Sequence, residues 1–314
     1  MKPLKAFMFP GQGIQKQGMG KELADHFPEA KRLFLKADTI AGRSISETMF
    51  HADESILSMC VNAQPAIFVY QVALAETQTD IRPDVVIGHS FGEYAALVVA
   101  KCLSFEDALH LVISRAELAR KSIDRGQEMA MAAIVGIETS IVERCLMDLT
   151  ENHRDSVYIA NYNGPGQTVI SGYREAVKTA CKILRTSGAK RTVMLPIEGA
   201  FHTPLISDLG LALSTEIENV YFARPEYPIC QCASSSITMD PTVIKNNLMR
   251  HAASPVDWTQ MIATLCDYGV RSFIEIGTDN SLQKIVRRML PDSTVTSILE
   301  FSTFKGIIPD YSIT

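Results

Sequence analysis

The chain has 314 residues, of which 46% are hydrophobic and 21% are charged, a composition typical of a globular protein that can bury a sizeable core. Its formal net charge of −5 comes without a long block of one sign, which excludes the basic surface that nucleic acid or an anionic membrane requires. The sequence has no run of about 18 apolar residues, and Pro10 cuts short the first apolar stretch, so we expect a cytoplasmic protein without a signal peptide or a membrane span.

The seven cysteines are scattered along the chain and odd in number. None of them stands in a CxxC pair or in a spacing with histidine that is typical of zinc sites. We therefore expect reduced, mostly structural thiols and no metal site.

Short β-type runs alternate with longer helical segments, which favours a parallel sheet covered by helices. The apolar run at 6–9 predicts a first strand that ends in a glycine-rich turn. A second strand is predicted at 85–87, and a helix rich in alanine, leucine and valine follows at 92–100 after one tight turn. The helical spacing of apolar residues over 107–121 predicts a further helix, which carries Arg115.

The order of expected strands and helices changes in the middle of the chain and predicts a separate unit there. Its elements follow the order βαββαβ, the ferredoxin-like pattern, which can close a small core of its own. The expected elements are strand 131–135, helix 140–149, strands 157–160 and 168–171, helix 175–187 and strand 191–195. Beyond this unit, the pattern predicts a helix at 205–219 and a strand at 272–276.

These patterns together predict an α/β fold with two subdomains. We expect a hydrolase-like parallel-sheet core formed by residues 1–128 and 197–303. A ferredoxin-like small subdomain is expected as an insertion at 129–196, and a C-terminal tail at 304–314.

The segment 88–92, Gly-His-Ser-Phe-Gly, fits the GxSxG pattern of a nucleophile elbow. Glycines flank the serine because so tight a strand-to-helix turn leaves no room for larger side chains. The pattern alone could be a plain glycine-bounded loop. Here it joins a predicted strand to a predicted helix, as the mechanism requires, so Ser90 is the predicted nucleophile.

This turn also places Ser90 near a helix N-terminus, where unpaired backbone N–H groups and the helix dipole stabilise developing negative charge. We expect the backbone N–H of Phe91 to be one donor of an oxyanion hole. The glycines of the turn at 10–13 let its backbone approach a ligand closely, so this turn is the candidate for the second donor.

Seven histidines compete for the role of the base that a serine nucleophile needs. His202 is the strongest contender, because it lies in a loop after the predicted strand at 191–195, from which a side chain can reach a neighbouring strand end. A hydrogen-bonded loop histidine remains the alternative. For His89 we predict a packing or orienting role, because neighbouring side chains on a tight turn diverge. A long stretch of chain follows His202, unlike the late base of ordinary α/β-hydrolases, so we do not expect a standard hydrolase triad.

Four segments, taken in order, resemble the malonyl-CoA:acyl carrier protein transacylase family. They are FPGQG (9–13), GHSFGEY (88–94), NYNGPGQTVISG (161–172) and GAFH (199–202). The resemblance covers nearly the whole chain.

The resemblance implies a ping-pong reaction, in which a serine takes an acyl group from coenzyme A and passes it to the phosphopantetheine thiol of an acyl carrier protein. Ser90 matches the nucleophile and His202 the base, and the backbone amides of Gln12 and Phe91 match the oxyanion hole. Arg115 matches the arginine that pairs with the free carboxylate of malonate, a role that suits its planar, bidentate guanidinium.

Two further residues concern selectivity and orientation. Phe201 resembles the malonyl-selecting version of its motif, since a bulky ring leaves little room for an α-methyl branch. The segment 251–258 resembles the family stretch whose backbone carbonyl orients the base histidine, although glutamine is common where His251 stands. We keep His251 as a candidate orienting residue. Ala116 is a second departure, because glycine is frequent at this position.

The resemblance further implies malonyl-CoA as substrate, an acyl carrier protein as partner and no bound cofactor. We expect a free-standing monomer that serves fatty acid synthesis or trans-acyltransferase polyketide synthesis. One alternative is an acyl hydrolase that clears stalled acyl groups from carrier proteins; Arg115 argues against it, because members of that group tend to lack this arginine. Another is a catalytically silent docking subunit, which the joint presence of Ser90, His202 and Arg115 opposes.

Overall fold

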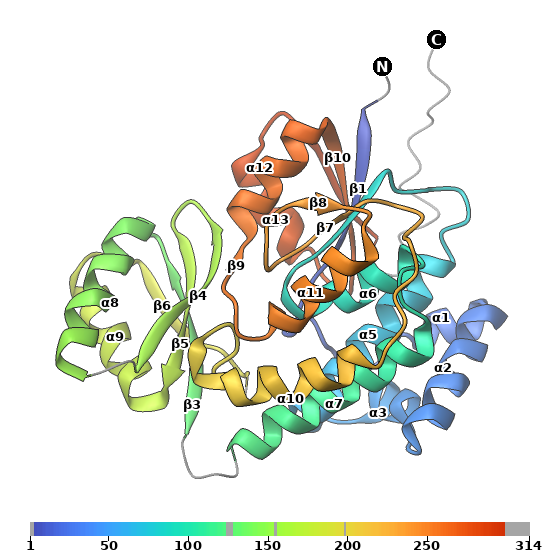
Figure 1. Ribbon diagram of the computed structural model, residues 1–314, viewed down its shortest axis with the longest axis horizontal. Helices are drawn as coiled ribbons and strands as arrows, with labels where there is room; N and C mark the ends of the chain where they lie inside the picture. The colour runs from blue at the N-terminus through green and yellow to red at the C-terminus, as the bar shows by residue number, and fades with distance from the viewer. Residues whose placement is uncertain (1–2, 124–127, 154–155, 198, 299–314) are drawn as a thin grey trace.

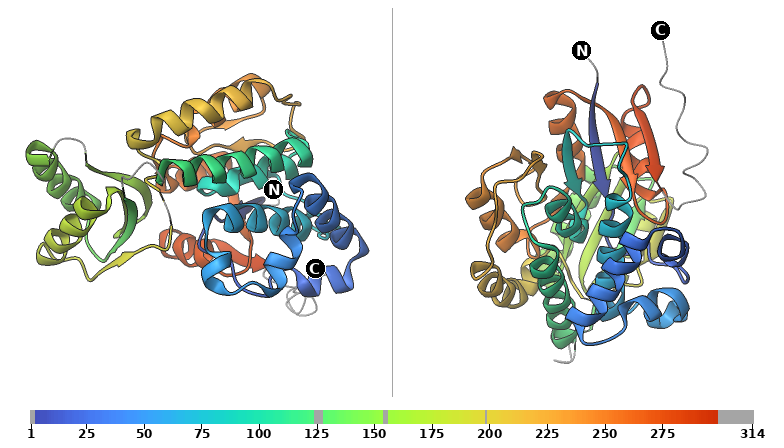
Figure 2. Two further views of the ribbon diagram at one scale, coloured as in Figure 1. Left: turned by 90° about the horizontal axis from the view of Figure 1, so that it is seen from below. Right: turned by 90° about the vertical axis from the view of Figure 1, so that its right-hand side faces the viewer.

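The computed structural model describes residues 3–123, 128–153, 156–197 and 199–298. They form a large unit around a six-stranded sheet and a smaller unit around a five-stranded sheet, drawn mainly in green (Figure 1). Figure 2 shows, from two further directions, that the small unit projects from one side of the large unit. No helix in the described ranges has the length and apolar character needed to cross a membrane.

The large sheet is parallel except at one edge. Its strands, in spatial order, are β11 (Thr294–Ile298), β10 (Val270–Ile276), β1 (Leu4–Phe9), β2 (Val85–Gly88), β7 (Ile229–Cys230) and β8 (Ile237–Thr238). Only β8 runs antiparallel to its neighbour. Because β1 and β2 are adjacent and parallel, the turns that follow them lie at the same edge of the sheet.

Helices cover both faces of this sheet. They are α1 (Lys21–His26), α2 (Pro28–Ala41), α3 (Ile45–His51), α4 (Glu54–Leu57), α5 (Cys60–Glu76), η1 (Ser90–Gly92), α6 (Glu93–Val99), α7 (Phe105–Ile123), η2 (Pro204–Ile206), α10 (Ser207–Glu218), α11 (Pro241–His251), α12 (Trp258–Tyr268) and α13 (Ser281–Met289).

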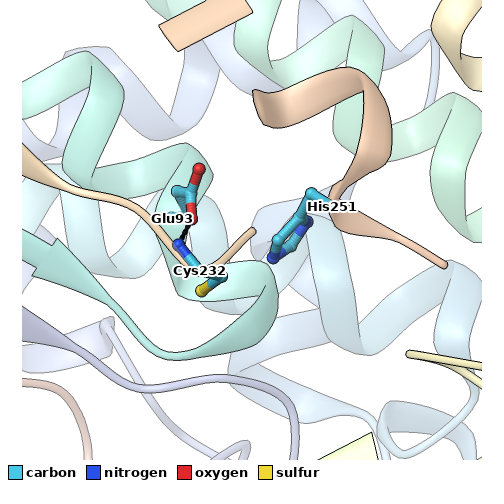
Figure 3. A group of neighbouring side chains, drawn as sticks. All are labelled: Glu93, Cys232 and His251. Atoms are coloured by element: carbon cyan, nitrogen blue, oxygen red, sulfur yellow. Dashed lines mark hydrogen bonds between the residues drawn. The ribbon is translucent and has the colours of Figure 1, made fainter. Parts of the chain in front are cut away.

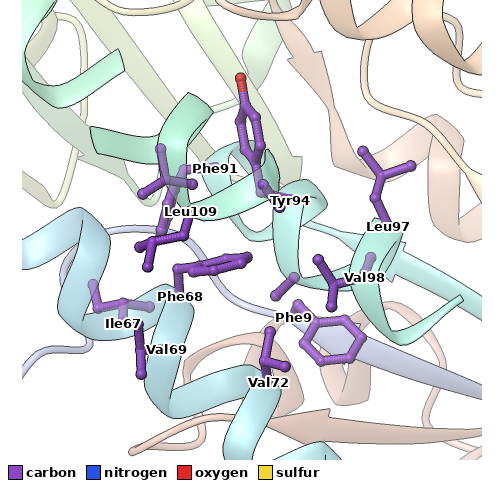
Figure 4. Packing of buried hydrophobic residues seen from close by; sticks show 14 of the residues in the cluster. Phe9, Ile67, Phe68, Val69, Val72, Phe91, Tyr94, Leu97, Val98 and Leu109 are labelled. Atoms are coloured by element: carbon purple, nitrogen blue, oxygen red, sulfur yellow. The ribbon is translucent and has the colours of Figure 1, made fainter. Parts of the chain in front are cut away.

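Apolar side chains of β1 alternate between the two faces of the sheet, so helices must pack on both faces. Phe7 and Phe9 join the apolar cluster that includes α5, α6 and α7, whereas Ala6 and Met8 join the cluster that includes α12 and α13. Helix α5 lies within the first cluster and is apolar on most of its circumference, which is typical of a helix buried in a core. Figure 4 shows its side chains packed against those of the first strand and of α6 and α7.

The small unit has the strand order β6, β3, β5, β4, β9. Its elements are β3 (Met129–Val135), α8 (Thr139–His153), β4 (Val157–Gly164), β5 (Gln167–Tyr173), α9 (Arg174–Thr186), β6 (Arg191–Met194) and the short β9 (Val256–Asp257). Pairing among β3, β4, β5 and β6 is antiparallel. A separate apolar cluster lies between this sheet and the helices α8 and α9, so the unit has its own core.

The two units are joined by more than the chain connections. Strand β9 comes from the part of the chain that builds the large unit, and it pairs in parallel with β4, with Asn161 opposite Val256. The hydroxyl of Thr259 donates a hydrogen bond to the carbonyl of Tyr162 over 3.2 Å. The guanidinium of Arg288 on α13 donates to the side chain of Gln167 on β5 over 2.5 Å.

The strands and helices predicted from the sequence are all present, with ends that differ by a few residues. The structure adds helices α1 to α5 between the first two strands, and α11 to α13, which the sequence analysis did not assign. It also adds the two-residue strands β7, β8 and β9 and the edge strand β11. The tail predicted at 304–314 lies outside the described residues.

Glu275 on β10 anchors the first turn of α13, and its removal tests this part of the fold. The carboxylate is fully buried and accepts hydrogen bonds from the backbone N–H groups of Leu282, over 3.1 Å, and Gln283, over 2.7 Å. We expect Glu275→Ala to lower the free energy of unfolding by about 1–3 kcal/mol, because it leaves buried donors unpaired. Urea unfolding measures this, with Glu226→Ala at an exposed position as the control, expected within about 0.5 kcal/mol of the native protein. Equal losses for both variants would contradict the anchoring role.

Candidate active site

Ser90 stands at a strained turn between β2 and α6. Its backbone φ of 53° lies in the left-handed region, which residues other than glycine seldom adopt. The flanking glycines are required by space: a Cβ at Gly88 would lie 2.1 Å from the backbone nitrogen of Glu93, and one at Gly92 would lie 2.1 Å from the carbonyl oxygen of Phe9. The turn therefore has the geometry of a nucleophile elbow, as the sequence predicts.

The turn after β1 is held against this elbow. The side-chain amide of Gln71 donates a hydrogen bond to the carbonyl of Pro10 over 2.7 Å, which fixes the turn from the core side. A Cβ at Gly11 would lie 3.0 Å from the carbonyl oxygen of His89, so glycine suits this close approach and a larger residue would push the two turns slightly apart. Gln12 and Phe91 consequently line the same cavity as Ser90, where their backbone amides were predicted to form the oxyanion hole.

His202 forms a hydrogen bond with the nucleophile. Its Nε2 lies 2.6 Å from Oγ of Ser90, and its Nδ1 lies 2.9 Å from the carbonyl oxygen of Ser254. A carbonyl only accepts hydrogen bonds, so Nδ1 carries the ring proton and Nε2 is free to accept the proton of the Ser90 hydroxyl. The sequence-based alternative, a histidine with a purely local hydrogen bond, does not describe this arrangement.

The loop around His202 is as constrained as the elbow. His202 has a φ of 65°, and its backbone N–H donates to the carbonyl of Ala252 over 2.8 Å. The sequence analysis expected a backbone carbonyl of the segment 251–258 to orient the base, with His251 as the candidate. The backbone of His251 contacts the ring of His202, and the carbonyl of Ser254, in the same segment, accepts a hydrogen bond from Nδ1. The reason is the turn that follows α11, which brings residue 254 toward the base. The ring of His251 packs edge-on against the ring of His202, with centroids 5.4 Å apart.

The surroundings of His202 keep it neutral. The side chain is 2% exposed, and burial, together with the positive charge of Arg115, lowers the pKa of His202 from 6.5 to about 3. A neutral imidazole can accept a proton from Ser90 across the physiological pH range.

Arg115 lies on α7, buried at 1% exposure on the face that points toward the cavity. Its guanidinium stands over the ring of Phe201, 4.3 Å from the ring centroid, and more distantly over the ring of Phe91. Within the described ranges no carboxylate forms an ion pair with it, and its Nε has no hydrogen-bond partner. A buried cation without a counter-ion costs free energy, so this position favours an anionic ligand.

His89 contacts side chains of the small unit and of α12. Its Nε2 lies 2.7 Å from the side-chain oxygen of Asn163 on β4, and its ring packs edge-on against Trp258 with centroids 5.2 Å apart. Burial lowers the pKa of His89. The sequence analysis did not single out Asn163, because the asparagine-rich motif gives no sign of which asparagine faces the large unit.

A cavity of about 270 Å³ connects these residues. The large unit contributes the two turns after β1 and β2, Arg115, the 201–202 loop and the first turns of α13. The small unit contributes one wall, formed by side chains of β3, β4 and β5: Met131, Ala133, Asn161, Asn163, Gln167 and Val169. A serine with a neutral base, candidate backbone donors and a buried arginine suit covalent transfer of an acyl group that carries a negative charge.

The low pKa of His202 predicts an unusual pH profile for Ser90 reactivity. We expect the rate of Ser90 labelling by a fluorophosphonate to stay nearly constant from about pH 5.5 to 8, because a lowered pKa keeps the imidazole neutral well below 6.5. Stopped-flow or gel-based labelling measures the profile, and Ser90→Ala should remain unlabelled at every pH. A fall in rate with a midpoint near 6.5 would mean that His202 is solvated and titrates normally.

Comparisons with known proteins agree with this geometry. The sequence model of the acyl transferase domain family matches residues 6–301. A malonyl CoA-acyl carrier protein transacylase of Bacillus subtilis strain 168 is 37% identical over 286 residues, which cover 90% of each chain. The crystal structure of an acyl carrier protein S-malonyltransferase from Vibrio cholerae superposes with a TM-score of 0.89 at 29% identity, over 96% of this chain and 98% of that one.

A second solved structure contains a carrier protein. It is a type II polyketide synthase acyl carrier protein in complex with its malonyl-transacylase, and it superposes with a TM-score of 0.91 at 28% identity. The match covers 96% of this chain and 98% of that chain.

Proposed function

Because this chain belongs to the malonyl-CoA:acyl carrier protein transacylase family, we propose that it moves a malonyl group from coenzyme A to the phosphopantetheine thiol of an acyl carrier protein through an ester on Ser90. The chain is an acyltransferase, like its curated relatives. The observation that carries the malonyl assignment is the buried guanidinium of Arg115, which lacks a carboxylate partner in the described ranges beside the Ser90–His202 pair.

The first half-reaction forms the acyl-enzyme. Oγ of Ser90 attacks the thioester carbonyl while Nε2 of His202 takes the hydroxyl proton, and the negative charge develops on the carbonyl oxygen. The backbone amides of Gln12 and Phe91 stabilise this charge. The carbon–sulfur bond then breaks, and the coenzyme A sulfur leaves with the proton from His202.

The second half-reaction reverses these roles. The phosphopantetheine thiol of the carrier protein gives its proton to Nε2 of His202 and attacks the ester carbonyl of Ser90. The carbon–oxygen bond to Ser90 breaks, and the serine oxygen recovers the proton. Because Nδ1 of His202 remains bonded to the carbonyl of Ser254, the ring keeps the same orientation in both steps.

Selection of the acyl group follows from Arg115 and Phe201. The guanidinium can bind the free carboxylate of malonate bidentately, and the ring of Phe201 holds the guanidinium in place from one side. The same ring limits the space for an α-methyl branch. Discrimination by one methyl group is worth only about 1–3 kcal/mol, so we expect a preference for malonyl over methylmalonyl rather than strict exclusion.

Intact mass spectrometry tests the acyl-enzyme directly. After mixing with malonyl-CoA, the native protein should gain the mass of one malonyl group, and Ser90→Ala should gain none, because Ser90 is the side chain that the base His202 contacts. Methylmalonyl-CoA and acetyl-CoA serve as comparison donors. A malonyl adduct on Ser90→Ala would assign the nucleophile to another residue.

The mass experiment also separates transfer from hydrolysis. The alternative of an acyl hydrolase predicts loss of acyl groups from a pre-loaded carrier protein without a stable adduct from any coenzyme A donor. A persistent malonyl adduct that disappears only when carrier protein is added favours the transferase.

Replacing Arg115 should change the choice of acyl group. We expect Arg115→Ala to slow malonyl transfer about 100-fold, because hydrogen bonds between charged groups contribute about 1.5–3 kcal/mol each, while acetyl transfer falls little or rises. Arg120→Ala, at an exposed position on the same helix, is the control and should leave both rates unchanged. The measurement is kcat/KM for each donor, and an unchanged malonyl-to-acetyl ratio would remove Arg115 from the acyl site.

We propose that the chain acts in fatty acid synthesis or in polyketide synthesis. Transfer in fatty acid synthesis or in polyketide synthesis uses the same chemistry, and a relative of known structure acts on a type II polyketide carrier protein. We infer that the protein works as a monomer and needs no cofactor for the two half-reactions, which require only the serine, the base and the backbone donors.

We also assign the two units to named architectures. The parallel arrangement of β11, β10, β1, β2 and β7 supports a hydrolase-like core formed by residues 1–128 and 197–303. The strand order β6, β3, β5, β4 with two helices on one face supports a ferredoxin-like insertion at 129–196. The pairing of β9 with β4 adds a fifth strand from the large unit.

A further inference from the structure

Three metal-ligating side chains meet beneath the nucleophile elbow. Glu93 is the first residue of α6, Cys232 follows β7 and His251 ends α11. Their ligand atoms all lie within 4.8 Å of one another, and none of the three residues is more than 3% exposed. Figure 3 shows the three side chains close together on three separate segments of the chain, with Glu93 hydrogen-bonded to the backbone N–H of Cys232. The proposed acyl transfer uses none of these side chains as a reacting group.

The imidazole of His251 lacks the partners that a buried polar group normally has. Neither ring nitrogen makes a hydrogen bond of normal geometry, although the ring has a weaker contact with the backbone of Ser90. The ring faces are covered by aromatic neighbours, with Tyr94 at 6.2 Å and His202 at 5.4 Å between centroids. A buried polar side chain without hydrogen-bond partners destabilises the fold, so its position calls for a ligand.

The carboxylate of Glu93 is held in a fixed orientation by its neighbours. Its Oε2 accepts a hydrogen bond from the backbone N–H of Cys232 over 2.8 Å, and its Oε1 accepts from the side-chain amide of Gln231 over 3.0 Å. The amide of Gln231 is itself held by the carbonyl of Ile244. Outer hydrogen bonds of this kind fix the orientation of ligands in metal sites.

We propose that Glu93, Cys232 and His251 form a binding site for a thiophilic divalent cation, with Zn²⁺ preferred. Carboxylate oxygen, thiolate sulfur and imidazole nitrogen are all ligands of zinc, and three protein ligands leave one coordination position open. A divalent cation with one carboxylate, one thiolate and one neutral imidazole has no net charge, which a fully buried site requires. Zinc–ligand distances of about 2.0–2.3 Å need the three ligand atoms, which lie within 4.8 Å of one another, to move closer together.

Binding changes the surroundings of the nucleophile. In the structure, the Cys232 thiol donates a hydrogen bond to the carbonyl of Gly88 over 3.1 Å. Coordination releases the thiol proton to solvent and frees this carbonyl, two residues before Ser90. Coordination also engages the ring of His251, which packs against the ring of the base His202.

Direct binding measurements test the site without relying on acyl transfer. Full-length protein, freed of metal by a chelator, is titrated with Co²⁺ and then with Zn²⁺ against a chromophoric competitor. We expect one equivalent of Co²⁺ to produce a near-ultraviolet thiolate-to-cobalt absorption band, and Zn²⁺ to displace it. Cys232→Ser should abolish the band, and His251→Gln, which installs the residue common in relatives, should weaken Zn²⁺ binding about 100-fold or more.

Cys102→Ser provides the matched control, because Cys102 is also a buried free thiol but lies outside the cluster. This variant should bind Zn²⁺ as the native protein does. His251→Gln keeps the test valid if Cys232→Ser fails to fold, and circular dichroism identifies that case. No cobalt band in the native protein, or equal Zn²⁺ affinity in native protein and His251→Gln, would overturn the proposal. Neither outcome affects the assignment of Ser90, which the mass experiment tests separately.

Discussion

The active site depends on the contact between the ends of two neighbouring parallel strands, β1 and β2. Their register places Phe9 opposite Gly88, so that the two turns that follow touch each other. Two glycines allow this: Gly11 lies against the carbonyl of His89, and Gly92 lies against the carbonyl of Phe9. A side chain at either position would separate the turns, and the nucleophile would lose its predicted oxyanion donors. The relative positions of the nucleophile and its predicted oxyanion donors therefore depend on the packing of the backbone in these two turns.

Burial lowers the pKa of both basic side chains at this site, with different outcomes for their charge. It keeps His202 neutral, so the base is ready to accept a proton, and it leaves Arg115 charged without a counter-ion. The two effects support each other, because the positive charge of Arg115 further disfavours a second cation nearby. A substrate carboxylate would offset the charge of Arg115 and would raise the proton affinity of His202 as the reaction begins. The positive charge of Arg115 is thus neutralised only when an anionic acyl group binds in the site.

The sequence was informative where local geometry demanded particular residues. The elbow at Ser90 requires two glycines, and the βαββαβ order can be read from periodicity alone, so both were predicted. The segment 251–258 was expected to orient the base through a backbone carbonyl, but Ser254 was not singled out within it, because any residue provides a carbonyl. Asn163 was missed because facing across a cavity depends on how two sheets are placed. The cluster of Glu93, Cys232 and His251 has no sequence signature, since its members come from segments that meet only in the folded chain.

The division of the cavity wall between two units has a consequence for how this enzyme can change over evolutionary time. Ser90, His202 and Arg115 all come from the large unit, whereas Met131, Ala133 and Val169 come from the sheet of the small unit. Met131 and Val169 belong to the apolar cluster that also contains Phe9, Phe91 and Phe201 of the large unit, whereas the separate cluster of the small unit does not include them. Substitutions on the cavity side of the insertion therefore also change the packing around the nucleophile turn. Acyl-chain tolerance and catalytic power are consequently coupled, and a lineage that broadened its substrates through the insertion would also have to repack this part of the core.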